Sequence, residues 1–262
     1  MTKYKYDLIP SEFDSRDYRV ETIYHTPIEF PSEYNVIDKL NPIRDQGTQG
    51  SCSAMTAAVV KEYHERKDVG FMDYMSPQFV YNLRRNAPEE GMTPRDTMQI
   101  LNRHGIVPEE IYPYNTIEPI TPNLLTIAKT YRIRSYARVH DIYGAKSSIM
   151  ANGPLYVGFP VYNERDNKFW RQTSPQQGFL GGHAVAIVGW NESGFIIRNS
   201  WSELWGRNGY SYYPYSDWGH HWEIWTLLDA DSSQYKLENI VDSYNKKQQI
   251  GCFGRIFRIK KK

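Results

Sequence analysis

The chain of 262 residues has few cysteines, no long apolar run and almost no net charge. Its two cysteines, Cys52 and Cys252, are too few for a disulfide-rich secreted scaffold or for a zinc site built on four cysteines. The spacing of the histidines does not suggest a site with two cysteines and two histidines. We therefore expect no metal site.

The ends and the charge of the chain narrow the class of protein further. No apolar stretch approaches the ~18 residues of a membrane-spanning helix, and the first residues hold no apolar segment typical of a secretory signal. With so few cysteines, this predicts an intracellular protein, cytoplasmic or virion-associated, with no membrane partner. The 31 basic and 30 acidic residues give a net charge of +1, which excludes a generally basic nucleic-acid binder.

The elements expected along the chain change in type near residue 131. Before it, helical spacing of apolar residues and typical Ser-Pro or Thr-Pro starts predict helices over 52–63, 76–86 and 94–104. After it, runs rich in Val, Ile and Tyr predict strands over 131–139, 154–161, 183–190 and 194–198. This order favours an α+β protein of two lobes, one mainly helical (30–130) and one rich in strands (131–230).

Three short segments contain the residue types of nucleophilic catalysis. Gln46 and Cys52 lie in a glycine-rich segment that leads into the first predicted helix, Gly-Gly-His183-Ala opens a predicted strand, and Asn199 stands in Arg-Asn-Ser-Trp. His183 and Asn199 follow Cys52 by about 130 and 150 residues, the order and distance of a Cys–His–Asn nucleophile system.

On these segments the chain resembles the papain-like cysteine peptidases of the cathepsin type, most of all their intracellular bacterial and viral members. The resemblance runs from about Phe30 to Leu228. It implies a two-lobed papain-like fold with a helical lobe, a β-barrel-like strand lobe and the active site in the cleft between them. It also implies an endopeptidase acting on protein or peptide substrates, without a cofactor, and we expect a monomer.

The chemistry explains why these residues occur together. A thiol at the N-terminus of a helix and beside an imidazolium has a lowered pKa, so Cys52 and His183 would form an ion pair that attacks a peptide carbonyl. Asn199 would orient the imidazole, and Trp201 resembles the family's indole that shields this contact. The resemblance assigns Gln46 as the side-chain donor of the oxyanion hole, with the backbone N–H of Cys52 as the second donor.

The substrate-binding residues rest on the same resemblance. Residues near Gly91 and Met92 would pair with the substrate backbone, although the family shows a second glycine where this chain has Met92. Small residues would leave room for a bulky apolar or aromatic side chain in the main specificity pocket. The residues expected to line it are Thr93, Pro94, Gly158 and Ala184.

The sequence leaves alternative functions open. Ser53 replaces an aromatic residue usual in the family, and with Met92 it favours the alternative of a catalytically silent peptide-binding or structural module. Acyl transfer to an amine instead of water is a second alternative. The tail, 231–262, holds eight basic and three acidic residues; it predicts a solvated end, with an anionic partner as the alternative, and the role of Cys252 stays open.

The first 29 residues precede the segment that resembles the family's mature N-terminus. They are rich in Pro and aromatic residues and lack a helical pattern. We call residues 1–29 the N-terminal arm, and we expect it to pack across the body and partly occlude the cleft.

Overall fold

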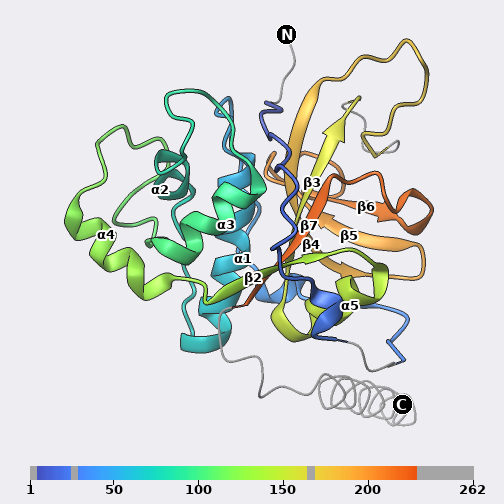
Figure 1. Ribbon diagram of the computed structural model, residues 1–262, viewed down its shortest axis with the longest axis horizontal. Coiled ribbons are helices and arrows are strands. Elements are labelled where there is room, and N and C mark those ends of the chain that lie inside the picture. The colour runs from blue at the N-terminus through green and yellow to red at the C-terminus, as the bar shows by residue number, and fades with distance from the viewer. Residues whose placement is uncertain (1–4, 25–28, 164–168, 229–262) are drawn as a thin grey trace, which may run out of the picture.

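The computed structural model describes residues 5–24, 29–163 and 169–228, and the predicted basic tail lies outside these residues. Figure 1 shows the helices α1 to α4 on one side, the strands on the other, and the arm running between them. The α+β, two-lobed expectation is confirmed. The helices are α1 (Cys52–Val69), α2 (Pro77–Asn82), α3 (Pro94–Arg103), α4 (Pro122–Ala128) and α5 (Ile142–Asn152), with short 3-10 turns at Val20–Thr22, Ile37–Lys39, Lys129–Tyr131 and Tyr215–Asp217.

The strands form one antiparallel sheet of seven members, in the order β2-β7-β3-β4-β5-β6, with β1 paired to β4. They are β1 (Tyr34–Asn35), β2 (Ser135–Val139), β3 (Leu155–Val161), β4 (Gly181–Trp190), β5 (Gly194–Arg198), β6 (Tyr210–Pro214) and β7 (Glu223–Leu228). Over the described residues, β2 and β6 are not paired with each other, so the sheet is open. Over these residues the expected β-barrel-like lobe is thus an open sheet and not a closed barrel.

Local sequence explains where the helices begin and end. The Ser76 and Thr93 side chains accept hydrogen bonds from backbone N–H groups three residues on, and a proline follows each cap. Both helix starts are thus confirmed. α2 ends at Asn82 instead of residue 86, because the chain turns before Ala87-Pro88 and a residue before proline disfavours helix. The helices α4 and α5 were not predicted.

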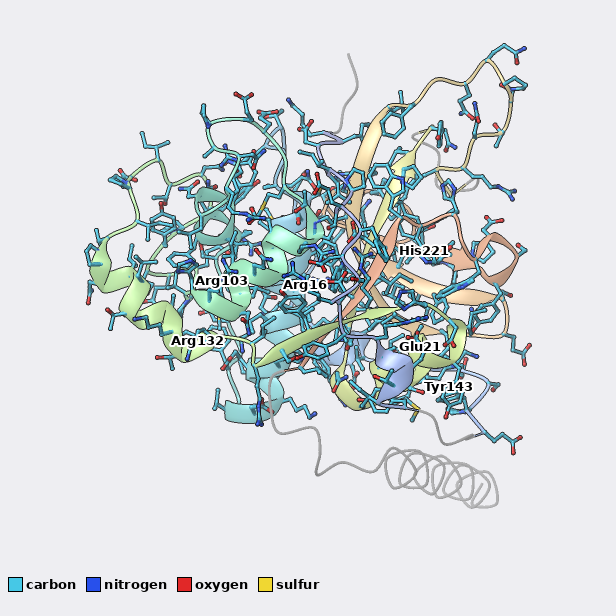
Figure 2. The ribbon with its side chains drawn as sticks, in the orientation of Figure 1. Arg16, Glu21, Arg103, Arg132, Tyr143 and His221 are labelled. Atoms are coloured by element: carbon cyan, nitrogen blue, oxygen red, sulfur yellow. The ribbon has the colours of Figure 1, made fainter. Side chains whose placement is uncertain are left out.

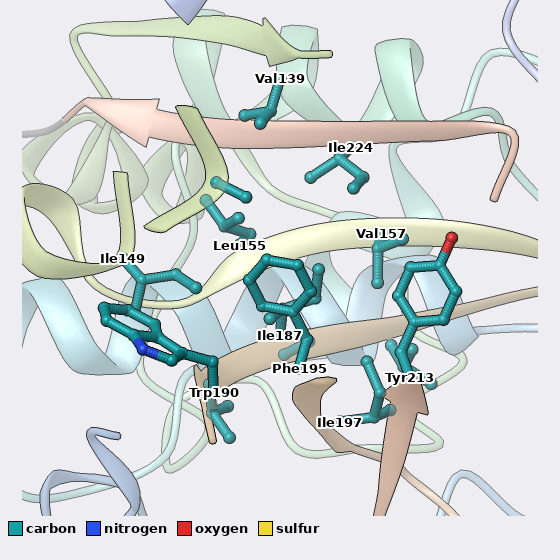
Figure 3. Close-up of a cluster of buried hydrophobic side chains, with 14 of the residues drawn as sticks. Val139, Ile149, Leu155, Val157, Ile187, Trp190, Phe195, Ile197, Tyr213 and Ile224 are labelled. Carbon is teal, nitrogen blue, oxygen red and sulfur yellow. The ribbon is translucent and has the colours of Figure 1, made fainter. Parts of the chain in front are cut away.

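Apolar side chains pack in two main clusters. One lies between the sheet and α5 and includes Ile149, Leu155, Trp190 and Phe195, as Figure 3 shows. The other joins α1 and α3 to β3, β4 and β7, and therefore spans both lobes. α1 is buried from Cys52 to Glu65 and contributes side chains to both clusters, with Cys52 in the second, so packing fixes its N-terminus between the lobes.

Side chains labelled in Figure 2 mark the two sides of the molecule. Arg103 and Arg132 lie on the helical side, and Tyr143 and His221 lie on the side of the strands. Arg16, from the arm, lies between them. None of the helices among the described residues is long and apolar enough to cross a membrane.

Candidate active site

Cys52 is the first residue of α1 and is fully buried. Ser51 occupies the N-cap position, but its side chain makes no capping hydrogen bond. The backbone N–H of Ala184, the residue that follows His183, faces the thiol and acts to lower its pKa. This contact places the nucleophile helix against β4 beside the imidazole.

The imidazole of His183 is held by Asn199 and Trp201. Nε2 of His183 lies 2.7 Å from Oδ1 of Asn199, which also accepts from the backbone N–H of Ser200 at 2.8 Å. Oδ1 is therefore the acceptor and Nε2 carries the hydrogen, which leaves the lone pair on Nδ1 in the neutral ring. The Trp201 indole stacks on the imidazole with centroids 4.1 Å apart. The geometry is that expected for an orienting amide and a shielding indole.

The electrostatics of this state differ from the expected ion pair. Burial raises the pKa of the Cys52 thiol to about 12, and the nearby carboxylate of Asp7 acts in the same direction. Burial lowers the pKa of His183 to about 3, against the effect of its hydrogen bond to Asn199. Nδ1 of His183 has no hydrogen-bond partner among the described residues. Thiol and imidazole are therefore both neutral while the cleft is filled.

Gln46 is buried in the loop that leads to Cys52. Its backbone N–H donates to the Ser200 carbonyl at 2.9 Å, and its Oε1 accepts from the Ser200 hydroxyl at 2.8 Å. Its Nε2 donates to the carbonyl of Gln49 at 3.2 Å. Because an amide nitrogen has two hydrogens, one donor remains for a ligand. Ser200, which the sequence did not single out, thus fixes both the Gln46 amide and the Asn199 amide.

The N-terminal arm fills the cleft. Leu8 N–H donates to the Gly182 carbonyl at 2.9 Å, and Ile9 N–H donates to the Met92 carbonyl at 3.1 Å. The arm therefore pairs with β4 on one side and with the segment before α3 on the other. Residues 5–9 of the arm thus occlude the cleft, as expected from the composition of the arm.

Leu8 occupies the expected specificity pocket. It is 4% exposed and belongs to the apolar cluster that contains Met92, Ala184 and Tyr156. A Cβ added at Gly158 would lie 2.7 Å from Leu8 Cδ2 and 3.8 Å from Pro94. The structure thus brings Met92, Pro94, Gly158 and Ala184 together around one leucine side chain.

Two other residues predicted to bind substrate are Gly91, which lies against the arm backbone, and Thr93, which caps α3. Gly91 has φ +81°, and a Cβ there would collide with the carbonyl oxygen of Asp7, so this glycine allows the arm backbone to approach closely. The Thr93 side chain caps α3 by accepting from Asp96 N–H at 3.0 Å. For Thr93 the structure therefore shows a capping role.

The described start of the arm lies against the imidazole of His183 and the indole of Trp201. The Tyr6 ring makes edge contacts with His183 and Trp201, at centroid distances of 6.3 and 5.6 Å. A Cβ at Gly50 would lie 2.5 Å from Oδ2 of Asp7, so the Asp7 carboxylate lies directly on the loop before Cys52. That oxygen is buried and has no hydrogen-bond partner among the described residues.

The direction of the arm is opposite to that of a cleavable peptide. In hydrolysis, His183 protonates the leaving amine, so the C-terminal part of a substrate lies toward His183 and Trp201. In the arm, the residue at His183 and Trp201 is Tyr6, and the residue in the pocket, Leu8, follows it in sequence. The arm therefore fills both sides of the cleft without presenting its own peptide bonds in the productive direction.

A buried hydroxyl network stands where the family usually has an aromatic residue. Ser53 Oγ lies 2.6 Å from Thr97 Oγ1 and 2.7 Å from the hydroxyl of Tyr156. Ser53 of α1 is thus joined by its hydroxyl to Tyr156 of β3, from the other lobe. Sequence reasoning noticed Ser53 but had no signal for its partner on a distant strand.

The remaining histidines do not extend the site. The helical pattern of the sequence from Cys52 to Tyr63 favours an exposed position for His64, but the side chain is buried and lies 2.8 Å from the carbonyl of Asn152. That expectation was wrong, because both faces of α1 are covered. Among the described residues, no group of three His, Cys, Asp or Glu side chains could hold a metal ion.

Comparison with known proteins agrees with this geometry. A family model described as papain family cysteine protease matches residues 30–221. A peptidase C1-like protein of Acanthamoeba polyphaga mimivirus is 30% identical in an alignment of 201 residues that covers 65% of this chain and 63% of that protein. Papain from Carica papaya is 29% identical in an alignment of 181 residues that covers 65% of this chain and 50% of papain. The chain thus spans half to two thirds of the length of these curated relatives.

Solved structures show the same architecture. Xylellain, a cysteine protease from Xylella fastidiosa, superimposes with a TM-score of 0.75 at 25% identity, over 88% of this chain and 98% of that one. A Carica candamarcensis cysteine protease, solved in complex with E-64, shares the fold at a TM-score of 0.58 and 20% identity, over 76% and 99%. Since the family match covers most of the chain and includes Gln46, Cys52, His183 and Asn199, the chain belongs to the papain family of cysteine proteases.

Proposed function

We propose that the protein is a cysteine endopeptidase that hydrolyses peptide bonds through a thioester on Cys52. The observation that carries this is the arrangement of Cys52 at the start of α1, against the backbone of Ala184, with an imidazole oriented by Asn199 and Trp201. When the cleft is open, water reaches the thiol and the imidazole, and the burial that keeps both groups neutral is lost. The ion pair would then form.

Hydrolysis follows from the positions of these groups. The thiolate attacks the carbonyl carbon, and the carbonyl oxygen takes the negative charge next to the Cys52 N–H and the free N–H of Gln46. The imidazolium of His183 gives its proton to the leaving amine, and the C–N bond breaks. His183 then takes a proton from water, which attacks the thioester and releases the acid and the thiol.

Cleavage within a chain is favoured by the path of the arm. Residues 5–9 cross the cleft without interruption, with Tyr6 on the side of Trp201 and Leu8 on the side of Pro94. A cleft that holds a continuous chain on both sides of the nucleophile suits an endopeptidase. Leu8 supports a preference for a bulky apolar side chain in the pocket next to Gly158.

The test is cleavage of peptides that carry leucine and are blocked at both ends, with product masses as the readout. Wild type is expected to yield two fragments from internal cleavage, and Cys52→Ala is expected to yield none. Cleavage restricted to unblocked peptides would contradict the endopeptidase assignment. An added amine nucleophile should not appear in the products; its incorporation would indicate acyl transfer.

The silent binding module is the second candidate, because the filled cleft and the neutral Cys52 thiol are also what a binding module would show. It predicts that both wild type and Cys52→Ala bind leucine-containing peptides without cleaving them. Turnover by wild type that disappears in Cys52→Ala would exclude it.

A further inference from the structure

The two donors expected at the oxyanion hole lie at the two ends of one short loop. Gln46 supplies a side-chain N–H at one end, and Cys52 supplies a backbone N–H at the other, where the first N–H groups of a helix have no partner within it. The loop between them contains Gly47, with φ +60°, and Gly50. Its conformation therefore sets how far apart the two donors are.

Tyr114 connects the two ends of this loop. Its hydroxyl donates to the backbone carbonyl of Gln46 at 2.8 Å and lies 2.5 Å from Oγ of Ser51, the residue before Cys52. Since a phenol has one hydrogen, Ser51 must donate to the Tyr114 oxygen when that hydrogen goes to Gln46. This explains why the Ser51 hydroxyl does not cap α1.

Tyr114 is itself held in place from the other side of the loop. Its backbone N–H donates to Oε1 of Glu109 at 3.3 Å. The other oxygen of Glu109 is paired with Arg44, whose carbonyl accepts from the backbone N–H of Ser202. The phenol is partly buried, and burial raises its pKa to about 12, so it stays a neutral hydrogen-bond donor.

We propose that Tyr114 is a positioning residue of the oxyanion hole: its hydroxyl fixes the separation of the Gln46 side chain from the Cys52 N–H. The proposal rests on the peptidase function proposed above. Tyr114 is not expected to touch the substrate. It acts through the loop, so its loss should weaken stabilisation of the tetrahedral oxyanion and leave thiolate formation unchanged.

The test is Tyr114→Phe in the full chain, measured in three reactions. In peptide hydrolysis we expect kcat to fall by about 10- to 50-fold, less than the ~10²–10³-fold typical of removing a donor itself, with KM within about 2-fold. The affinity for a peptidyl aldehyde, which forms a tetrahedral oxyanion on the thiol, should fall by a similar factor. The rate of alkylation by iodoacetamide, which forms no oxyanion, should stay within about 2-fold. The arm covers the wild type and the variant alike.

The matched control is Tyr112→Phe, two residues away. The Tyr112 hydroxyl donates to the carbonyl of Glu118 at 2.5 Å and accepts from the Asn82 amide, so it does not touch the loop. We expect kcat and aldehyde affinity of the control to stay near wild type. Ser51→Ala tests the same connection without altering the tyrosine, and should reproduce the selective loss if Tyr114→Phe fails to fold.

The outcomes separate the two proposals. Wild-type kcat and aldehyde affinity in a folded Tyr114→Phe would overturn the positioning role. An equal loss in alkylation and in hydrolysis would also overturn it, since Tyr114 would then act on the Cys52–His183 pair. Absence of turnover in wild type, with or without the arm displaced, would instead contradict the proposed function.

Discussion

Leu8 Cδ2 fills the space beside the Cα of Gly158, so that a side chain at Gly158 would meet it at 2.7 Å. A leucine from the chain's own N-terminus thus occupies the pocket formed by β3 and the start of α3. The neighbouring backbone contacts to Gly182 and Met92 hold this residue on both sides. The arm therefore competes directly with any peptide for the cleft.

Leu8→Asp should open the cleft. Burial of a leucine side chain is worth about 1.5–3 kcal/mol, which corresponds to a ~10- to 100-fold change in the fraction of molecules with an empty cleft. We expect peptide hydrolysis at limiting substrate to rise by that factor. Ile9→Asp is the matched control, because the Ile9 side chain is 43% exposed and its backbone supplies the contact to Met92. Equal activation by both variants would contradict a role for the pocket.

Occlusion should weaken as the pH rises, because of Asp7. Burial in the cleft raises the pKa of its carboxyl; Lys5 on the arm opposes this shift, while Glu90 before α3 adds to it. Cys52 of α1 and Tyr81 of α2 also face this group. A pKa that is higher in the closed state favours closure below the ordinary carboxyl pKa, and this stabilisation is lost as the pH rises through the raised value.

The measurement is the rate of Cys52 alkylation from pH 4 to pH 8 in wild type and in Asp7→Asn. The asparagine cannot ionise, so the ratio of wild-type rate to variant rate should increase with pH and then level off. Alkylation requires the arm, and Asp7 with it, to leave the cleft, so the titration of Cys52 in the open state is common to both proteins and cancels in this ratio. A ratio that does not change with pH would refute the assignment to Asp7.

The arm consists of a displaceable part and a structural part. Residues 5–9 lie in the cleft, whereas Val20 is fully buried in the core beside the sheet, and the Tyr18 carbonyl accepts from Arg138 N–H at 2.7 Å. Deletion of residues 1–10 should therefore leave a folded and activated protein. Deletion of residues 1–29 should lower the free energy of unfolding by at least ~2 kcal/mol, because it removes Val20 from the core. Comparable unfolding curves for the two deletions would contradict this division.

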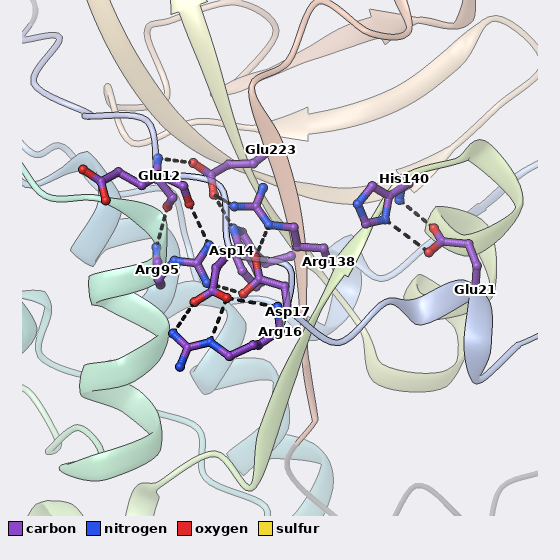
Figure 4. A network of polar contacts seen from close by, with 11 residues as sticks. Glu12, Asp14, Arg16, Asp17, Glu21, Arg95, Arg138, His140 and Glu223 are labelled. Carbon is purple, nitrogen blue, oxygen red and sulfur yellow. Dashed lines mark hydrogen bonds and ion pairs between the residues drawn. The ribbon is translucent and has the colours of Figure 1, made fainter.

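Asp17 anchors the structural part across both lobes. Its carboxylate accepts hydrogen bonds from Arg95 of α3 and from Arg138 of β2, the latter at 2.7 Å, as Figure 4 shows. Although burial acts to raise the pKa of Asp17, these two guanidinium groups hold it below its ordinary value. Its stabilising effect is therefore present above the pKa of an unfolded aspartate and is lost as the pH falls through the lowered value.

Asp17→Asn should lower the free energy of unfolding by about 1.5–3 kcal/mol at neutral pH, and the difference from wild type should shrink in acid. Denaturant unfolding at pH 7 and pH 3 measures both effects. Asp14→Asn is the control, since Asp14 pairs with the highly exposed Arg16. An Asp17→Asn protein as stable as the control would show that the two arginines do not anchor the arm.

The sequence predicted the fold, and it predicted which residues the structure brings together at the cleft, because both depend on local patterns. Ser76-Pro77 and Thr93-Pro94 specify helix starts through capping that needs no tertiary context. The segments around Cys52, His183 and Asn199 are short and ordered, so their spacing was sufficient to place them in one site. The family assignment was confirmed by the match over 30–221.

What could not be predicted depends on contacts between distant segments. The pairing of Ser53 with Tyr156 joins α1 to β3, and nothing near either residue specifies the other. The exposure of His64 was misjudged because helix periodicity does not show that a second face is covered by tertiary packing. The direction of the arm depends on which backbone groups of Gly182 and Met92 it meets, and this is not encoded in its composition.

The most direct test of an assembled peptidase site closed by its own arm is the rate at which a peptidyl epoxide labels Cys52, followed by intact mass. We predict slow single labelling of wild type, labelling ~10- to 100-fold faster in Leu8→Asp, and a return to slow labelling in Leu8→Asp with His183→Ala. Equal rates in Leu8→Asp with and without His183→Ala would contradict the account, because opening the cleft would then have exposed a thiol that His183 does not activate.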